Sequence, residues 1–233
     1  MRKLAQLILF SFIIFSLIYI IGFSPLFIID EVDVRGTDLP REQILETAGL
    51  APGQNLLFYR TETGISNLLR DARFRSVIIT KEYPNRLLIN IDSRQPFVNI
   101  YQGGNTITLD SSGLVIEINQ PDETLVQLRG FTVTEASLGE PIVSTEAATL
   151  KKALDLANLV TQTTLSDCMI SYEDSHLLLH IGDTWKIKFG SANQIEEQFS
   201  AFKALYDQLV DQGTTGGVVD VTNASIAVFK PFE

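Results

Sequence analysis

The sequence predicts an α+β protein in three parts, and three patterns support this. An apolar run without charged residues extends from Leu4 to Phe23 and predicts a helix. Residues 26–96 alternate short apolar strands and helices in the order β-α-α-β-β. Residues 97–233 combine further strands with two amphipathic helices, which predicts a mixed α/β domain built on an antiparallel sheet. The expected boundaries are therefore 1–3 for a tail, 4–25 for the first helix, 26–96 for a small domain and 97–233 for a larger one.

The composition excludes several classes of protein. Apolar residues make up 45% of the 233 residues and charged residues 20%, which is typical of a folded chain rather than a disordered one. The 28 acidic residues outnumber the 18 basic ones, so the net charge of −10 argues against binding to nucleic acid. Cys168 is the single cysteine, so an intrachain disulfide is excluded.

The N-terminal segment favours a retained transmembrane helix. Arg2 and Lys3 precede the apolar run, and the next charged residue is Asp30. The Leu, Ile and Phe residues contribute roughly −4 to −8 kcal/mol to insertion. A cleaved signal peptide fits less well, because the apolar run continues through "GFSPLF" without an A-x-A-like site. We expect a single pass through the cytoplasmic (inner) membrane, with residues 1–3 in the cytoplasm and the C-terminus outside it.

The charge of the exterior part bears on its relation to lipid. The whole chain carries −10, of which Arg2 and Lys3 contribute +2, so the remainder carries −12. A surface of that sign is not expected to adhere to anionic lipids.

The small domain is predicted from "LFIIDEVDVRG", two short helices within residues 39–72, and two strands that meet at Pro84-Asn85. Val77 and Ile79 point to one face of the first of these two strands. In the second strand a matching face is shared by Leu87, Ile89 and Ile91. In the second helix the residues expected to be buried are Ile65, Leu68 and Leu69.

The larger domain begins with a predicted hairpin over residues 105–118, with its turn at residues 110–113. A strand is expected in residues 124–133, and an amphipathic helix in residues 144–162. The buried stripe of that helix is predicted to contain Leu150, Ala153, Leu154, Ala157 and Val160.

Three successive strands are then expected at "DCMISYE", "HLLLHIG" and "WKIKFG". Ser191 and Gln194 have the spacing of a capping box at the start of a second helix. The chain closes with a strand, a turn at Thr222-Asn223 and a terminal strand over residues 225–230.

Two groups of residues are candidates for a metal site or a nucleophile. His176 and His180, with Asp174 or Glu173, have a strand spacing that would place zinc ligands together. Cys168 with a nearby histidine would give a thiol nucleophile. Both groups are better explained by side chains of ordinary strands, and no nucleotide, hydrolase or metalloprotease motif occurs. We therefore expect no enzyme activity, no cofactor and no metal.

Several short motifs carry a family resemblance. In "YPNRLLINIDSRQPFVN" the residues that carry it are Pro84, Leu87, Ile89, Ile91, Arg94 and Pro96. "LDSSGLV", residues 109–115, is similar to the motif that opens the second domain of the same family. With the β-α-α-β-β order, the chain resembles the FtsQ/DivIB family of bacterial cell-division proteins, whose first extracytoplasmic domain is a POTRA module. Ser93 departs from the pattern, because relatives usually carry Glu there. The final strand region departs as well, because relatives often have an Arg after the Asp, a neighbourhood that Thr222 occupies here.

The resemblance implies a non-enzymatic scaffold of the divisome at the division septum. It would link cytoplasmic and periplasmic steps of septum assembly by binding FtsB/FtsL-type (DivIC/FtsL-type) bitopic coiled-coil proteins through an open sheet edge. Further partners implied are the septal peptidoglycan synthase and its associated proteins. The residues expected to bind partners are Asn223, Ser225, Ile226, Ala227, Val228 and Phe229, with a second docking surface on the POTRA domain at Arg86, Leu88 and Asn90.

The terminal strand is apolar on both faces, so the sequence does not tell which face meets the partner. Ile226 and Val228 share one face, whereas Ala227 and Phe229 share the other. One face is expected to be core and the other to form partner pockets, unless all four residues are core. On this basis Phe229→Ala, or proline at Ala227, is expected to abolish partner capture while the POTRA domain stays folded. The alternative function is that of a POTRA-bearing component of polypeptide transport or outer-membrane assembly.

Overall fold

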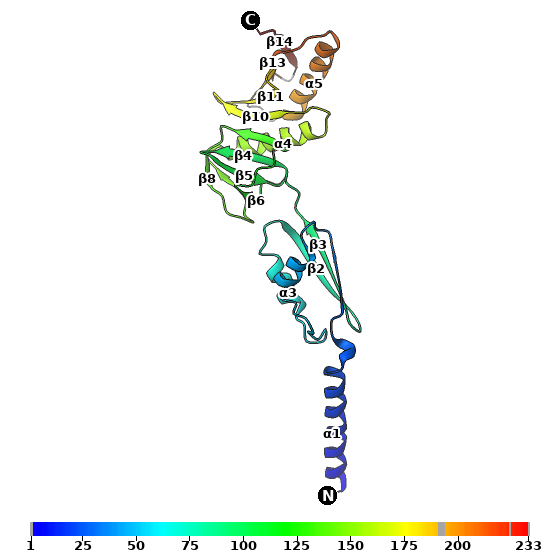
Figure 1. Ribbon diagram of the computed structural model, residues 1–233. Coiled ribbons are helices and arrows are strands. Elements are labelled where there is room, and N and C mark those ends of the chain that lie inside the picture. The colour runs from blue at the N-terminus through cyan, green and yellow to red at the C-terminus, as the bar shows by residue number, and fades with distance from the viewer. Residues whose placement is uncertain (1, 191–193, 224, 233) are drawn as a thin grey trace. The chain divides into compact units, whose positions relative to one another are not determined.

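The structure is a computed structural model that describes residues 2–190, 194–223 and 225–232, with the backbone alone for residues 2–5 and 21. Figure 1 shows the course of the chain. The chain divides into two compact units, Met1–Ser93 and Arg94–Glu233, each with its own hydrophobic core.

The first unit begins with the helix α1, Arg2–Gly22, followed by the short 3-10 helix η1, Pro25–Phe27. The described apolar side chains of α1, such as Phe15, are exposed along the helix. Over the described residues, we find no helix that combines the length and the apolar character needed to cross a membrane. The predicted transmembrane helix at residues 4–25 is therefore not confirmed.

The rest of the first unit has the predicted β-α-α-β-β order. Its elements are β1 (Glu31–Arg35), α2 (Arg41–Thr47), α3 (Thr61–Leu68), β2 (Phe74–Glu82) and β3 (Arg86–Ser93). The sheet has the strand order β1-β3-β2, with β1 parallel and β2 antiparallel to the central β3. The predicted order of three strands and two helices is confirmed, and the three strands form one sheet.

The alternation of the two long strands decides which face of this sheet is core. Val77 and Ile79 of β2 are buried, as are Leu87, Ile89 and Ile91 of β3. They share a core with Ile44 of α2 and Leu68 of α3. The burial predicted for Leu69 was wrong, because α3 ends at Leu68 and the Leu69 side chain turns to solvent.

The second unit contains eleven strands and two long helices among its described residues. They are β4 (Val98–Gln102), β5 (Asn105–Leu109), β6 (Val115–Ile118), β7 (Val126–Arg129), β8 (Val133–Glu135), β9 (Val143–Ser144), α4 (Ala147–Thr161), β10 (Cys168–Glu173), β11 (His176–Ile181), β12 (Trp185–Phe189), α5 (Ile195–Asp211), β13 (Gly217–Asn223) and β14 (Ile226–Lys230). Nine of the strands form one sheet in the order β14-β13-β12-β11-β10-β7-β4-β5-β6, and β8 pairs with β9.

This large sheet is mixed, not purely antiparallel as the sequence predicted. The pairs β4–β7, β7–β10 and β12–β13 are parallel. Parallel neighbours need a crossover connection between them, commonly a helix. The helix α4 lies between β7 and β10 in the chain, and α5 lies between β12 and β13, so two of the parallel pairs follow from the positions of the helices.

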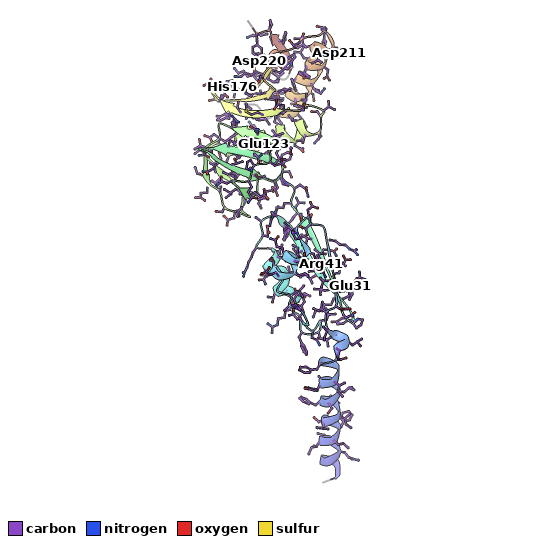
Figure 2. The ribbon with its side chains drawn as sticks, in the orientation of Figure 1. Glu31, Arg41, Glu123, His176, Asp211 and Asp220 are labelled. Carbon is purple, nitrogen blue, oxygen red and sulfur yellow. The ribbon has the colours of Figure 1, made fainter. Side chains whose placement is uncertain are left out.

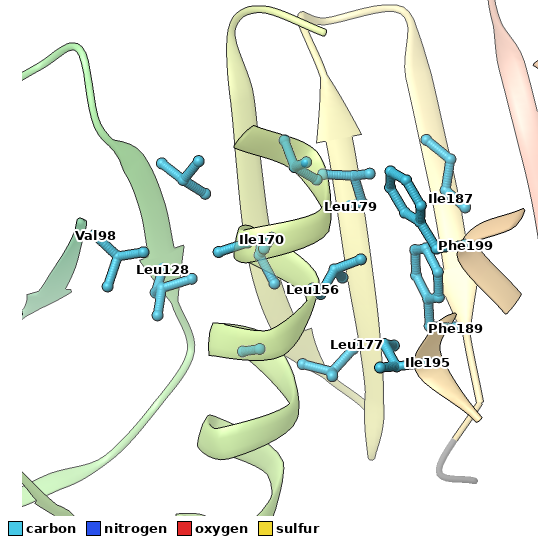
Figure 3. Packing of buried hydrophobic residues seen from close by; sticks show 14 of the residues in the cluster. Val98, Leu128, Leu156, Ile170, Leu177, Leu179, Ile187, Phe189, Ile195 and Phe199 are labelled. Atoms are coloured by element: carbon cyan, nitrogen blue, oxygen red, sulfur yellow. The ribbon is translucent and has the colours of Figure 1, made fainter. Parts of the chain in front are cut away.

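Both helices pack on the same face of the large sheet. Figure 3 shows Leu156 of α4 and Phe199 of α5 directed at buried strand residues such as Ile170 and Ile187. The stripe predicted for α4 is correct except that Leu156 is fully buried, whereas Leu154 is only partly buried.

The helix α5 starts at Ile195 with Gln194 in the N-cap position and no side-chain capping bond. The predicted capping residue Ser191 lies outside the described residues.

A buried ion pair holds the start of the second unit. The Asp110 side chain is 1% exposed, and its carboxylate accepts a hydrogen bond from Arg94 Nη1 at 2.7 Å. It also accepts bonds from Ser112 N at 2.9 Å, Ser112 Oγ at 2.6 Å and Leu114 N at 3.0 Å, which close the β5–β6 turn. Burial by itself would raise the pKa of Asp110, but the bonds from Ser112, Leu114 and Arg94 lower it below its ordinary value.

We predict that Asp110→Ala lowers the free energy of unfolding of the second unit by about 3 kcal/mol, because it leaves the largely buried Arg94 unpaired. The stabilisation by Asp110 is fully present above the pKa of the unfolded carboxyl, about 3.9, and is lost as the pH falls through the lower folded pKa. Urea unfolding monitored by the fluorescence of Trp185, which lies in this unit, measures both effects. Asp110→Asn is the matched control. The difference in free energy of unfolding between the parent and Asp110→Asn should narrow as the pH falls below 4. A difference that stays constant would show that the Asp110 carboxylate does not stabilise the fold.

Candidate protein-interaction site

The sequence-predicted binding residues lie at one end of the large sheet. β14 is the last strand in the sheet order and pairs with β13 alone among the described strands. The antiparallel register joins Val218 to Lys230, Val219 to Phe229 and Asp220 to Val228. The structure therefore places Ile226, Ala227, Val228 and Phe229 on an edge strand, Asn223 at the end of β13 and Ser225 in the turn between the two strands.

The two faces of β14 have different surroundings. Phe229 and Ala227 pack against the core, and the Phe229 ring lies 6.1 Å from that of Trp185. The Phe229 ring also covers Gly217, where a Cβ atom would come within 2.4 Å of the ring, so the absence of a side chain there makes room for it. Ile226 is 60% exposed and Val228 44% exposed. The outer face is therefore the one available to a partner.

The turn before β14 is held by polar side chains. The register of β13 and β14 shifts between Asp220 and Asn223. Asp220 Oδ1 accepts hydrogen bonds from Thr222 N at 3.0 Å and Thr222 Oγ1 at 2.7 Å, and Asn223 Oδ1 accepts one from Ser225 N at 3.0 Å. From the core side, Gln198 Nε2 of α5 donates to Thr222 O at 3.2 Å. These bonds connect the edge strand to the body of the domain.

Charged residues that sequence reasoning missed lie beside this edge. Asp220, labelled in Figure 2, lies opposite Lys188 of β12 in the strand register on one side and opposite Val228 of β14 on the other. Burial tends to raise the pKa of Asp220, but the Thr222 bonds and the charges of Lys188 and Lys230 lower it overall. The alternation in "WKIKFG" is the sequence signal that could have identified Lys188 as outward-facing, but only the strand order places it near β14.

The opposite end of the sheet is covered by the chain itself. Val115 N of β6 donates to Glu140 O at 2.9 Å, and Gly139 N donates to Val115 O at 2.9 Å. Ile142 N also donates to Gly113 O at 3.0 Å. Among the described residues, no backbone hydrogen bond of this kind reaches the outer edge of β14. The two ends of the sheet therefore differ in the exposure of their backbone groups.

The second predicted surface, on the POTRA domain, has a different character. Arg86, Leu88 and Asn90 lie on β3, the central strand, on the face away from the helices. The Arg86 guanidinium lies 3.4–3.6 Å from the carboxylates of Glu82, Glu31 and Asp33. Because both edges of β3 are paired, docking here would use side chains and not strand addition. This surface stays a prediction.

The structure also shows the surroundings of the candidate zinc ligands and of the candidate thiol nucleophile. His180 Nε2 lies 3.0 Å from Ser171 Oγ, and His176 Nδ1 lies 2.7 Å from Asp174 O. In the described part of the chain, no three His, Cys, Asp or Glu side chains come together as metal ligands. Burial and the nearby Asp167 raise the pKa of Cys168 to about 11, which disfavours the thiolate that a nucleophile requires.

Comparison with known proteins agrees with this architecture. Residues 27–94 match the family described as POTRA domain, FtsQ-type, so the first unit contains such a domain. A cell division protein DivIB of Clostridium botulinum strain Hall is 24% identical over 95% of this chain and 89% of its own length. A cell division protein FtsQ of Corynebacterium glutamicum is 23% identical over 78% of this chain and 80% of its own length.

The fold and the comparisons define the class of the protein. It is a POTRA-bearing protein with a separate C-terminal sheet domain. Its residues 27–94 match the FtsQ-type POTRA family, and the chain as a whole is similar to bacterial cell-division proteins named DivIB and FtsQ, in agreement with the resemblance carried by the sequence motifs.

The different surroundings of the two faces of β14 change what the Phe229→Ala variant can test. Phe229→Ala cannot test partner binding alone, because Phe229 packs on the core. We predict that it lowers the free energy of unfolding by about 2 kcal/mol, somewhat less than for a fully buried phenylalanine. Val228→Ala, one residue away on the outer face, should change it by no more than about 0.5 kcal/mol. Urea unfolding of both variants checks this, and equal losses of stability would show that the two faces are not distinct.

Proposed function

We propose that the protein is a non-enzymatic divisome scaffold that binds partners by accepting their strands along the outer edge of β14. The observation that carries the proposal is the difference between the two ends of the large sheet. Residues 139–142 cover β6, while the outer edge of β14 has no described neighbour. An uncovered edge presents backbone N–H and C=O groups that another chain can pair with.

Similarity to proteins named for cell division supports the choice of partner. The relatives are named for cell division, and that role at the septum is carried over to this chain as part of the proposal. The partners we propose are FtsB/FtsL-type (DivIC/FtsL-type) bitopic division proteins, which would add a strand next to β14. The septal peptidoglycan synthase and its associated proteins would join through these partners.

The energetics indicate that side chains must contribute to affinity. Six ladder hydrogen bonds would stabilise a complex by about 6 kcal/mol net. Association costs about 4–15 kcal/mol, so backbone pairing alone is close to balanced. Covering the exposed parts of Ile226 and Val228 adds roughly 1–2 kcal/mol for each side chain. A partner strand with apolar residues on the matching face would therefore bind more tightly than a polar one.

A membrane tether at α1 is part of the proposal. The helix has 21 residues, and its sequence carries no charge from Leu4 onwards. At about 1.5 Å per residue, this length is close to the hydrocarbon thickness of a bilayer. The exposed leucine, isoleucine and phenylalanine side chains of α1 also favour lipid as their surroundings. The tether would hold the scaffold in the cytoplasmic (inner) membrane, with residues 26–233 outside the cytoplasm. Release of the chain from membranes by an alkaline wash would contradict a tether.

Proline substitutions test strand addition directly. Successive backbone N–H groups of an edge strand alternate between its two sides, so of Ala227 and Val228 one donates to β13 and the other faces outward. We predict that Ala227→Pro and Val228→Pro behave differently. The variant that loses the outward N–H should keep the parent's unfolding curve but weaken binding at least tenfold, because a ladder bond is lost and the ring blocks the approach.

The assay is binding of the full chain, in detergent, to the extracytoplasmic segments of the two bitopic proteins. Ile78→Pro, on the edge strand β2 of the other unit, is the matched control and should leave this binding unchanged. Undiminished binding by both β14 proline variants would rule out strand addition at this edge.

A further inference from the structure

Exposed apolar side chains gather at one end of the POTRA domain. Phe23 is 69% exposed, Leu26 59%, Phe58 64% and Tyr83 62%. These four residues, three of them aromatic, form a patch that we call the aromatic collar. They come from three separate segments: the end of α1 with η1, the loop before α3, and the turn between β2 and β3.

Hydrogen bonds bring the three segments together. Leu56 N donates to Phe27 O at 2.7 Å, which joins the loop that carries Phe58 to η1. Asp30 N donates to Asn85 O at 3.0 Å, which joins the β2–β3 turn to the start of β1. Lys81 Nζ donates to Leu57 O at 3.3 Å, which joins β2 to the same loop. In Figure 1 the tip of the β2–β3 hairpin and η1 lie at the end of the domain that follows the last turn of α1.

The collar continues from the last turn of α1. Asn55 Nδ2 donates to the carbonyl oxygen of Gly22 at 2.7 Å, which satisfies an acceptor at the helix end. The Phe58 ring packs against Gly22, and its centroid lies 6.3 Å from that of Phe23. Phe23 in turn lies 4.7 Å from the Tyr19 ring of α1. The apolar surface of α1 thus extends onto the folded domain without a flexible linker.

A set of exposed aromatic rings at the end of an apolar helix fits the boundary between lipid and water. Tyrosine and other amphipathic rings are favoured there, because the ring lies among apolar groups while polar atoms stay hydrated. The neighbouring charges include Asp30 and Glu31, both exposed, and Glu31 is labelled in Figure 2. Arg86, 3.5 Å from Glu31, and Lys81, bonded to Leu57 O, offset these carboxylates, so the charge beside the collar is mixed and matches zwitterionic rather than anionic lipid headgroups.

We propose that the aromatic collar inserts into the headgroup region of the bilayer and seats the POTRA domain on the membrane. This inference rests on the proposed tether at α1. It adds that Phe58 and Tyr83, far from α1 in sequence, contact lipid directly. The domain is then held against the membrane surface at more than one point.

Tryptophan scanning of the full chain in vesicles of zwitterionic lipid tests the proposal. The variants Phe58→Trp and Tyr83→Trp each add one tryptophan, and the parent with its buried Trp185 gives the background emission. Phe15→Trp reports on α1, and Ile78→Trp is the matched control on the exposed face of the same sheet. Vesicles with bromine atoms high on the acyl chains quench only tryptophans near the headgroups.

We expect the emission added by Phe58→Trp and by Tyr83→Trp to be blue-shifted relative to that of a tryptophan in water, and to be quenched in the brominated vesicles. The emission added by Ile78→Trp should not be quenched. Phe15→Trp should be quenched most strongly by bromine near the chain ends. Quenching of Phe15→Trp without quenching of the two collar variants would overturn the insertion of the collar and leave the tether standing. If Phe15→Trp is not quenched by either lipid, both the tether and the collar contact are refuted.

Discussion

The end strand of a sheet can pair only half of its backbone groups within that sheet, and this constraint shapes the second unit. Buried backbone groups need hydrogen-bond partners, so a sheet edge must be solvated, covered by its own chain or paired with another chain. At β6 the segment 139–142 covers the edge. At β14 the described chain leaves the edge uncovered, and the outer face carries Ile226 and Val228. Apolar side chains beside unpaired backbone groups are the combination that strand addition requires.

The interior of the domain makes this edge rigid. Phe229 packs on Trp185 and over Gly217, while α5 binds the end of β13 through Gln198 and Thr222. A preformed edge loses less conformational entropy on binding than a disordered segment does. The contacts of β14 with the core therefore hold the strand in the conformation that a partner strand would pair with.

Much of the fold could be predicted from the sequence, because period-two alternation identifies strands and their buried faces. In β2 and β3 one face is apolar and the other is mostly polar, with Ile78 and Leu88 as exceptions, so Val77, Ile79, Leu87, Ile89 and Ile91 were assigned correctly. In β14 both faces are apolar, so alternation alone could not show that Phe229 faces inward. In α4 the periodicity likewise could not show which of Leu154 and Leu156 is fully buried, because both lie at the margin of the apolar stripe. The structure buries Leu156 fully and Leu154 only in part.

Other features depend on contacts between residues far apart in sequence. The parallel pairing of β7 with β10, and the covering of β6 by residues 139–142, leave no periodic pattern in the sequence. The position of Lys188 beside Asp220 likewise follows from the strand order. The family resemblance implies that the end of the chain binds partners, and the sheet order places that region on an edge strand.

Hydrogen exchange of the β14 amides tests the central claim most directly. In the full chain at low concentration, the amides of β14 that face away from β13 should exchange rapidly, while Val115 of β6, bonded to Glu140, should be protected. Adding the bitopic partners should slow the outward amides of β14 and leave Val115 unchanged. Protection of every β14 amide in the chain without partners would show that both sides of the strand are already paired, and would contradict an open edge.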